Sequence, residues 1–166
     1  LALVMVLGLT TGAGAAGAKY SSWFAPYYKE MQELGILPSS FTSGDLTATI
    51  TRGEMCELAV VAFEKATGNV IDELERTDYF TDTTDKNILK AYEYGIVSGY
   101  PDGSFRPDQK ITRAETVTMI NRVLERVPAK ELRLLSRSIM LIFPDNEPGE
   151  WYYIAMQEAS NSHEYQ

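Results

Sequence analysis

The sequence has very little of the two residue types that most often bind metals or carry nucleophilic catalysis. It contains one cysteine, Cys56, and one histidine, His163, in 166 residues. A single cysteine excludes an internal disulfide, and because Cys56 lies on an apolar helical pattern we predict a buried thiol. A lone histidine has no partners for a histidine zinc site or a Ser/His/Asp triad. We therefore predict no metal, no cofactor and no redox centre.

Positive charge is also scarce. Lys+Arg number 15 and Asp+Glu number 23, so the formal net charge is −8 and the pI is near 4.7. Nucleic-acid binding takes its affinity from a basic surface, which excludes a nucleic-acid partner. Apolar residues make up 45% of the chain, enough for the core of one or two compact units. An anionic partner would have to be held by individually placed arginines.

A long apolar run is missing as well. Residues 1–9 (LALVMVLGL) form the most apolar stretch, which is too short to span a membrane comfortably and is followed by glycines. Residues 16–18 (AGA) fit the small-residue pattern that signal peptidase requires. We interpret residues 1–18 as the remnant of a secretory signal, so that the mature chain begins near Lys19 without an integral membrane span. A membrane anchor or a buried core helix is the alternative.

The sequence does contain one helix-start signal twice. Thr51 is followed three residues later by Glu54, and Thr112 by Glu115. In each pair the hydroxyl can accept from the backbone N–H of the glutamate, while the carboxylate reaches back to the threonine N–H. Such a cap is worth about 1 kcal/mol. We therefore predict helices that begin at both threonines.

The segments before these two caps are similar. Residues 95–115 (GIVSGYPDGSFRPDQKITRAE) match residues 35–54 (GILPSSFTSGDLTATITRGE) in order and almost in length. In both, the first glycine can end a helix in the left-handed conformation. Equal order and near-equal spacing indicate an internal repeat.

We divide the chain into three units on this basis. The first, 20–68, is divergent, and the second, 79–126, is the best preserved. A third, 143–166, opens with FPD as the second opens with FTD, but it stops before a second helix. We expect a first helix with Trp23, Tyr27, Met31 and Leu34 on one face, and a turn at 101–103 followed by an extended run at 104–107. The helix that begins at Thr112 should bury Val117, Ile120, Val123 and Leu124. Asp82 and Asp145 are expected to cap the starts of helices.

These motifs closely resemble the S-layer homology (SLH) domain, a repeat that anchors proteins to the bacterial cell surface. The match is strongest in GIVSGYPDGSFRPDQKITRAE, weaker in the first unit, and limited to FPD and Trp151 in the third. The resemblance implies a mainly α-helical fold, a pseudo-threefold spindle of helix–loop–helix repeats whose third repeat is incomplete here. It also implies a secreted, non-catalytic module of the cell wall or S-layer, which binds a secondary cell-wall polymer carrying pyruvylated amino sugars on peptidoglycan. The resemblance also allows the chain to bind further copies of itself in a surface layer.

Under this resemblance, four residues are candidate polymer ligands. Arg52 and Arg113 each stand at the first position of a predicted helix, beside unpaired backbone N–H groups and the positive end of the helix dipole. A guanidinium there offers a forked donor to a pyruvyl carboxylate. Trp23 and Trp151 could stack on sugar rings. The alternatives are solvated arginines and tryptophans in the core.

Catalysis within these residues has little support. The acid pairs Glu54/Glu57 and Asp82/Asp85 could be cast as glycosidase carboxylates, but all four lie on predicted caps or exposed helix faces. The PDGSF segment lacks the ligand spacing of a calcium loop. The alternative function is the anchor region of an exported enzyme, such as a glycan hydrolase, whose catalytic domain lies beyond this chain.

Overall fold

Helices joined by long loops make up the described part of the chain. The computed structural model describes residues 17–126 and 139–161. Within them no helix is both long and apolar enough to cross a membrane. The described residues form two isolated β-bridges and no β-sheet. The mainly α-helical fold is thus confirmed, while most of the predicted signal lies outside the described residues. The elements are η1 (Ser22–Phe24), α1 (Ala25–Leu34), η2 (Ser39–Thr42), α2 (Arg52–Thr67), α3 (Lys86–Glu93), α4 (Arg113–Val123) and α5 (Tyr153–Ser160).

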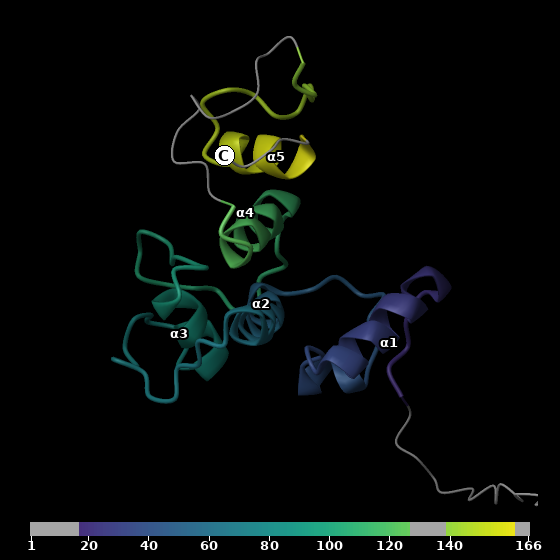
Figure 1. The fold of residues 1–166 in the computed structure, drawn as a ribbon. Coiled ribbons are helices and arrows are strands. Elements are labelled where there is room, and N and C mark those ends of the chain that lie inside the picture. The colour runs from purple at the N-terminus through teal and green to yellow at the C-terminus, as the bar shows by residue number, and fades with distance from the viewer. Residues whose placement is uncertain (1–16, 127–138, 162–166) are drawn as a thin grey trace, which may run out of the picture.

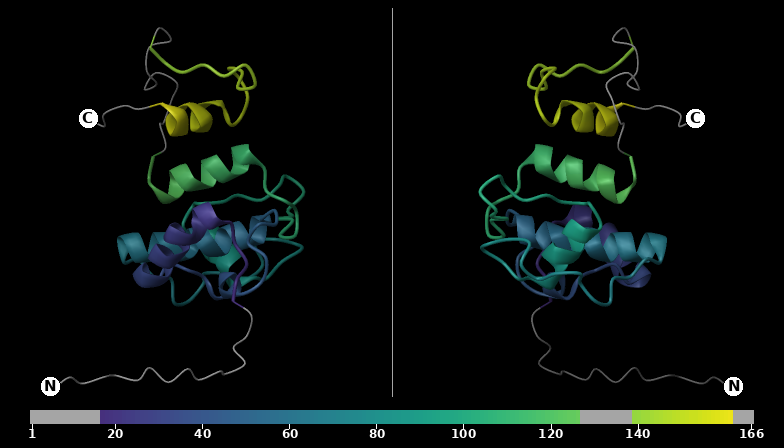
Figure 2. Two further views of the ribbon diagram at one scale, coloured as in Figure 1. Left: turned by 90° about the vertical axis from the view of Figure 1, so that its right-hand side faces the viewer. Right: turned by 90° about the vertical axis from the view of Figure 1, so that its left-hand side faces the viewer.

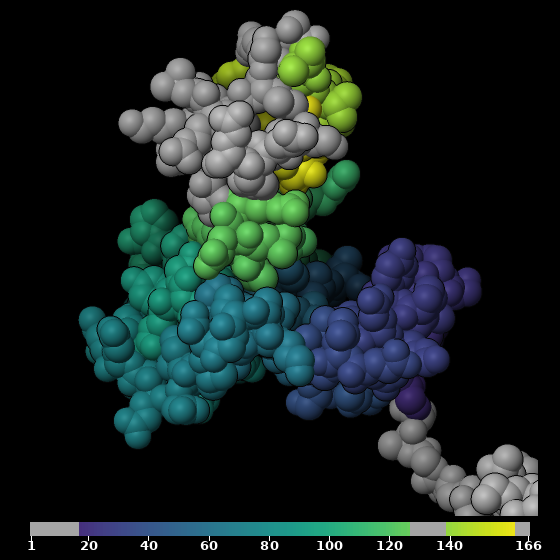
Figure 3. All heavy atoms as spheres, in the orientation of Figure 1, coloured from purple at the N-terminus to yellow at the C-terminus, as the bar shows by residue number. Residues whose placement is uncertain are grey.

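The helices pack in a repeating order. The two helices that begin with capping boxes each pack against the next helix in the chain, α2 against α3 and α4 against α5. The helix α4 also packs on α2, which joins the two pairs. Figure 1 shows α5 stacked beyond α4 and α1 standing to one side of α2, and Figure 2 shows the same stacking from the side. In Figure 3 the α1 segment forms a separate lobe beside the others. The threefold arrangement and the unit boundaries remain predictions.

The core lies between α2, α3 and the loop after α3. Cys56 is fully buried there, as predicted, and burial raises the pKa of its thiol to about 12, so that it stays protonated. Phe105 has no exposed surface and lies 5.1 Å, between ring centroids, from Phe80. The buried apolar cluster comprises Cys56, Ala59, Val60, Phe63, Phe80, Ile88, Leu89, Ala91, Ile96, Val97, Phe105 and Met119.

The helix ends predicted from capping boxes and glycines are confirmed. Both capping boxes are complete, at Thr51 with Glu54 and at Thr112 with Glu115. The glycines at 35, 68 and 95 adopt positive φ angles of 67°, 73° and 71°. The turn at 101–103 also forms, because the Asp102 carboxylate accepts from the N–H and the hydroxyl of Ser104.

The predicted buried faces of two helices are confirmed only in part, since Met31, Val117 and Val123 are half-buried and Val123 packs against the core. In α1, Tyr28 is buried because Tyr20 from the preceding segment stacks on it at 4.5 Å, whereas Tyr27 is exposed. In α4, Met119 is buried in the core cluster, and Asn121 is buried where its amide donates to the carbonyl of Ala155 in α5 at 2.8 Å. The residues left exposed are Trp23, Tyr27, Leu34, Ile120 and Leu124.

The segment after the turn differs from the predicted extended run. Arg106 has a φ of 60°, in the left-handed region that a residue with a Cβ rarely adopts. The carboxylate of Asp82 holds this bend, since it accepts from the N–H groups of Phe105 at 2.8 Å and Arg106 at 2.7 Å. Asp82 is therefore not a helix cap, and Asp85 caps α3 instead. At the other expected cap, α5 begins after Tyr152 without a side-chain cap, so Asp145 does not start that helix.

Gly99 is required by close packing rather than by its backbone angle. A Cβ at this position would lie 2.6 Å from the Phe80 ring and 2.9 Å from the carbonyl of Ser104. We expect Gly99→Ala to lower the free energy of unfolding by about 1–3 kcal/mol, the range for overpacked cores, as measured by urea denaturation. A variant as stable as the wild type would contradict this packing.

Candidate functional site

Arg52 lies inside the protein, between the start of α2 and the loop after α3. Its side chain is 8% exposed and pairs with the carboxylate of Glu115, Nη1 to Oε1, at 2.6 Å. Nε donates to the carbonyl of Phe105 at 3.1 Å, and Nη2 to that of Ser98 at 3.5 Å. The rings of Phe105 and Tyr100 lie 4.6 and 5.0 Å from its Cζ atom. All three guanidinium nitrogens therefore have partners within the chain.

The backbone at the start of α2 is occupied too. The N–H of Arg52 donates to the carbonyl of Gln109 and the N–H of Gly53 to that of Pro107, both at 2.9 Å. A Cβ on Gly53 would lie 3.3 Å from that Pro107 oxygen. The expectation of free N–H groups beside Arg52 is therefore wrong, because the loop of the second unit covers this helix end.

Glu115 joins the second capping box to the first unit. Its Oε2 accepts from the N–H and the hydroxyl of Thr112, both at 2.9 Å. Its Oε1 accepts from Arg52 and, at 3.2 Å, from the hydroxyl of Tyr100. Burial opposes ionisation of Glu115, but the hydrogen bonds from Thr112 and the charge of Arg52 outweigh burial and hold its pKa below the usual value.

This lowered pKa predicts a loss of stability in acid. When the pKa of a carboxyl group is lower in the folded chain than in the unfolded chain, its stabilisation is complete above the unfolded pKa, about 4.3, and is lost as the pH falls through the folded pKa. We expect the free energy of unfolding of Glu115→Gln to fall less between pH 7 and pH 3 than that of the wild type, as measured by urea titrations. An identical fall in both proteins would contradict the assignment.

Arg113, in contrast, faces solvent. It is the first residue of α4, its side chain is exposed, and within the described residues no hydrogen bond or ion pair holds its guanidinium. It lines a cavity of about 760 Å³ between the start of α4 and the segment that leads into α5. Trp151, which is 66% exposed, lines the same cavity. The structure thus brings together one predicted arginine and one predicted tryptophan.

Three further polar residues of this cavity were not predicted as ligands. Tyr100 comes from the loop after α3, and Asp145 and Asn146 precede α5. Asn146 is 3% exposed, and its amide oxygen has no hydrogen-bond partner within the described residues. A buried acceptor without a partner is uncommon in folded proteins. No sequence signal singles out Asn146, whereas Asp145 belongs to the repeated FPD motif.

A second cavity adjoins the first. It encloses about 480 Å³ beside α4 and shares three lining residues with the first cavity, namely Tyr100, Glu115 and Trp151. Arg52 lines this second cavity, and its mostly enclosed side chain borders the space with three of its five N–H groups already bonded within the chain. Together the two cavities form one surface around the start of α4 with Trp151 between them.

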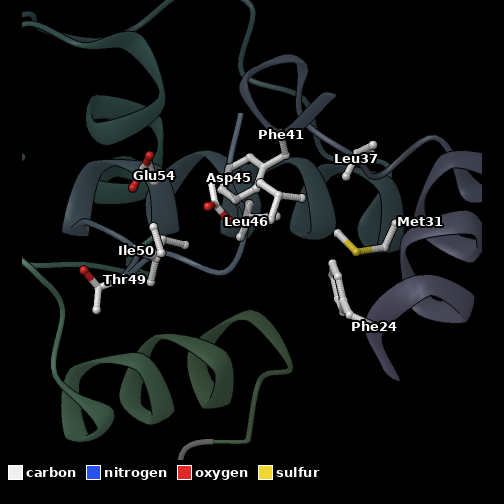
Figure 4. Close-up of a pocket in the computed structure, with 11 residues that line it drawn as sticks. Phe24, Met31, Leu37, Phe41, Asp45, Leu46, Thr49, Ile50 and Glu54 are labelled. Atoms are coloured by element: carbon white, nitrogen blue, oxygen red, sulfur yellow. The ribbon is translucent and has the colours of Figure 1, made fainter. Parts of the chain in front are cut away.

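Trp23 lies elsewhere. It belongs to η1, is 72% exposed, and packs edge-on against Phe24 at 5.7 Å. The nearby cavity of about 410 Å³, between α1 and α2, is mostly apolar, and Phe24 of η1 and Met31 of α1 point into it in Figure 4. Trp23 lines none of these three cavities. Both tryptophans are thus exposed rather than in the core, but only Trp151 lies with Arg113.

The described residues hold no group of three or more His, Cys, Asp or Glu side chains that could bind a metal ion. The four carboxylates considered for catalysis make structural hydrogen bonds. Glu54 completes a capping box, Asp85 caps α3, and Asp82 binds two backbone N–H groups. Glu57 accepts from the hydroxyl of Ser40 at 2.5 Å.

Residues 80–117 match the S-layer homology domain family. This range begins at the FTD motif, contains α3, and ends in the first half of α4. It therefore includes Arg113, Glu115 and Tyr100. No solved structure matches the chain.

Three proteins illustrate the similarity to known sequences. A cellulosome-anchoring protein of Acetivibrio thermocellus is 30% identical over 154 residues, which are 88% of this chain and 31% of that protein. Cell surface glycoprotein 1 of the same organism is 37% identical over 78 residues, 47% of this chain and 3% of that protein. An endoglucanase of a Bacillus species is 33% identical over 112 residues, 64% of this chain and 11% of the enzyme. The chain thus spans less than a third of each of these relatives.

Proposed function

Because this chain carries an S-layer homology domain and is a secreted protein of the bacterial cell surface, we propose that its anchoring function rests on binding an anionic cell-wall glycan around the start of α4. The ligand is a secondary cell-wall polymer attached to peptidoglycan, with a carboxylate such as that of a pyruvyl ketal. The module itself is non-catalytic. It holds the rest of a surface protein at the wall without a covalent bond.

One observation carries this proposal: Arg113 is exposed and has no internal partner, in a cavity that also contains an exposed tryptophan. A guanidinium at the first position of a helix combines a forked donor with the positive end of the helix dipole, which suits a carboxylate. The indole of Trp151 offers a flat apolar surface to a sugar ring. The guanidinium of Arg113 and the helix dipole thus suit the carboxylate of an acidic sugar, and the indole of Trp151 suits its ring.

The acceptors in the cavity suit the remaining groups of such a ligand. Sugar hydroxyl and amide N–H groups are donors, and the carboxylate of Asp145 and the unpaired amide oxygen of Asn146 are acceptors. The chain's net charge of −8 does not prevent anion binding, because exposed charges more than about 8 Å away are largely screened at physiological salt. Local geometry therefore decides which ligand is bound.

Polymer contacts by Arg52 and Trp23 remain predictions. Arg52 borders the second cavity with three of its five N–H groups already bonded within the chain. Trp23 is exposed but lines neither cavity around the start of α4. Trp23 is a suitable control for Trp151, since both indoles are exposed but only Trp151 lines the cavity that contains Arg113. We propose that Trp151 makes the main stacking contact.

Sedimentation with purified cell walls tests the function. The wild-type chain should co-sediment with intact walls and lose binding when the polymer is stripped from the peptidoglycan. Trp151→Ala should bind more weakly than Trp23→Ala. Equal binding of the wild type to intact and stripped walls would refute the polymer as ligand.

The alternative function is the anchor region of an exported enzyme. The similarity to an endoglucanase of which this chain spans 11% supports it. A catalytic domain would then lie beyond these residues, and the coding sequence after Gln166 would reveal it. Self-association in a surface layer is a separate proposal that sedimentation velocity at several concentrations would test.

A further inference from the structure

The carboxylate of Glu115 is shared between two units of the chain. One oxygen completes the capping box at Thr112, and the other accepts from Arg52 and from Tyr100. Arg52 is the first residue of α2, while Arg113 is the first residue of α4. The first turns of the two capping-box helices are therefore connected through one side chain.

We propose that Arg52 is a positioning residue for the polymer site, which acts through Glu115 to fix the first turn of α4 and hence the direction of Arg113. This inference rests on the proposed function and assigns Arg52 a different role from Arg113, although both occupy the same motif. Glu115 transmits the effect, since one of its carboxylate oxygens accepts from Arg52 and the other from Thr112 at the start of α4.

The enclosure of Arg52 supports positioning rather than ligand contact. Its side chain is 8% exposed, and its three nitrogens donate to Glu115, Phe105 and Ser98. Two of the five guanidinium N–H groups have no partner within the described residues, but the enclosure of the side chain limits their access to a ligand carboxylate. The connection also crosses a long stretch of chain, since Arg52 and Glu115 are 63 residues apart.

A fixed first turn should improve affinity. A long arginine side chain on a frayed helix end loses more conformational freedom on binding than one on an ordered turn, so preorganisation lowers the cost of binding. The same connection fixes Tyr100, which lines both cavities. Arg52 thus orders two of the groups around the ligand without contacting it.

Glu115→Gln and Glu54→Gln form a matched pair of test variants. Glutamine can complete a capping box as glutamate does, so both variants should fold. Glu115→Gln loses the charge that holds Arg52, whereas Glu54 in the first box binds Thr51 and has no arginine partner within the described residues. We expect Glu115→Gln to bind intact walls about fivefold more weakly, within the range of coupled pairs, and Glu54→Gln to bind like the wild type.

Amide hydrogen exchange provides a readout that needs no ligand. The N–H groups of Glu115 and Thr116, which donate to Thr112, should exchange at least about fivefold faster in Glu115→Gln, with α2 unchanged. If Arg52 contacts the polymer itself, Glu115→Gln frees the Arg52 guanidinium for the ligand. Wall binding of this variant would then equal or exceed that of the wild type, and this result would overturn the inference. Unchanged exchange at the start of α4 also overturns it. Absence of wall binding by the wild type would refute the proposed function. The hydrogen-exchange result would still decide whether Arg52 and Glu115 order the first turn of α4.

Discussion

Replacing Arg113 with alanine is expected to weaken binding of the chain to intact cell walls about tenfold or more, the effect of removing one charge-assisted hydrogen bond. The guanidinium is exposed and has no internal partner within the described residues, so its loss should leave the fold intact. Binding isotherms from sedimentation, with thermal unfolding of the same samples, would measure both effects. Arg113→Lys should be intermediate, because lysine keeps the charge but loses the forked geometry.

Arg126→Ala is the matched control for this loss of charge. Arg126 is also exposed and lies just past the other end of α4, outside the cavities described above. It should bind walls like the wild type. If Arg113→Ala and Arg126→Ala bound equally well, the assignment of the site to the start of α4 would fail.

Replacing Phe105 with alanine should cost about 3–5 kcal/mol of folding free energy, the range for a fully buried aromatic residue. The ring has no exposed surface, packs on Phe80, and lies beside the Arg52 guanidinium. Its removal would open a cavity between the two units and loosen the Arg52 connection as well. Urea denaturation followed by circular dichroism would measure the loss.

An exposed aromatic residue gives the comparison for this variant. Trp23 is 72% exposed, so Trp23→Ala should change stability by less than about 0.5 kcal/mol, as is usual for surface positions. A loss below about 1 kcal/mol for Phe105→Ala would show that the two units are not joined through this ring.

Helix ends marked by a capping box or a glycine could be predicted from the sequence. The caps expected at Asp82 and Asp145 were wrong, and the helix faces were predicted only in part. A capping box is a local device that depends on two side chains three residues apart, and both boxes formed. The buried face of α1 depends instead on Tyr20, which stacks on Tyr28. That of α4 depends on both α2 and α5, and the contact of Asn121 with α5 is made across 34 residues. Tertiary contacts of this kind leave no periodic signal in the helix itself.

The same distinction applies to the candidate site. The repeat placed Arg52 and Arg113 at equivalent positions, and both do begin capped helices. Their surroundings differ because the loop at 107–109 covers the first and a cavity adjoins the second. Motif spacing cannot reveal which copy is covered by its neighbour. Asn146 was missed for the same reason, since its importance lies in an unpaired buried oxygen.

Titration of the released wall polymer into the isotopically labelled chain tests the central claim most directly. The sequence contains two tryptophans, so their indole N–H groups give two resolvable signals. We predict that the Trp151 indole and the Arg113 side chain shift together on addition of polymer while the Trp23 indole does not move. A shift confined to Trp23, or no shift at any of the three, would contradict the account.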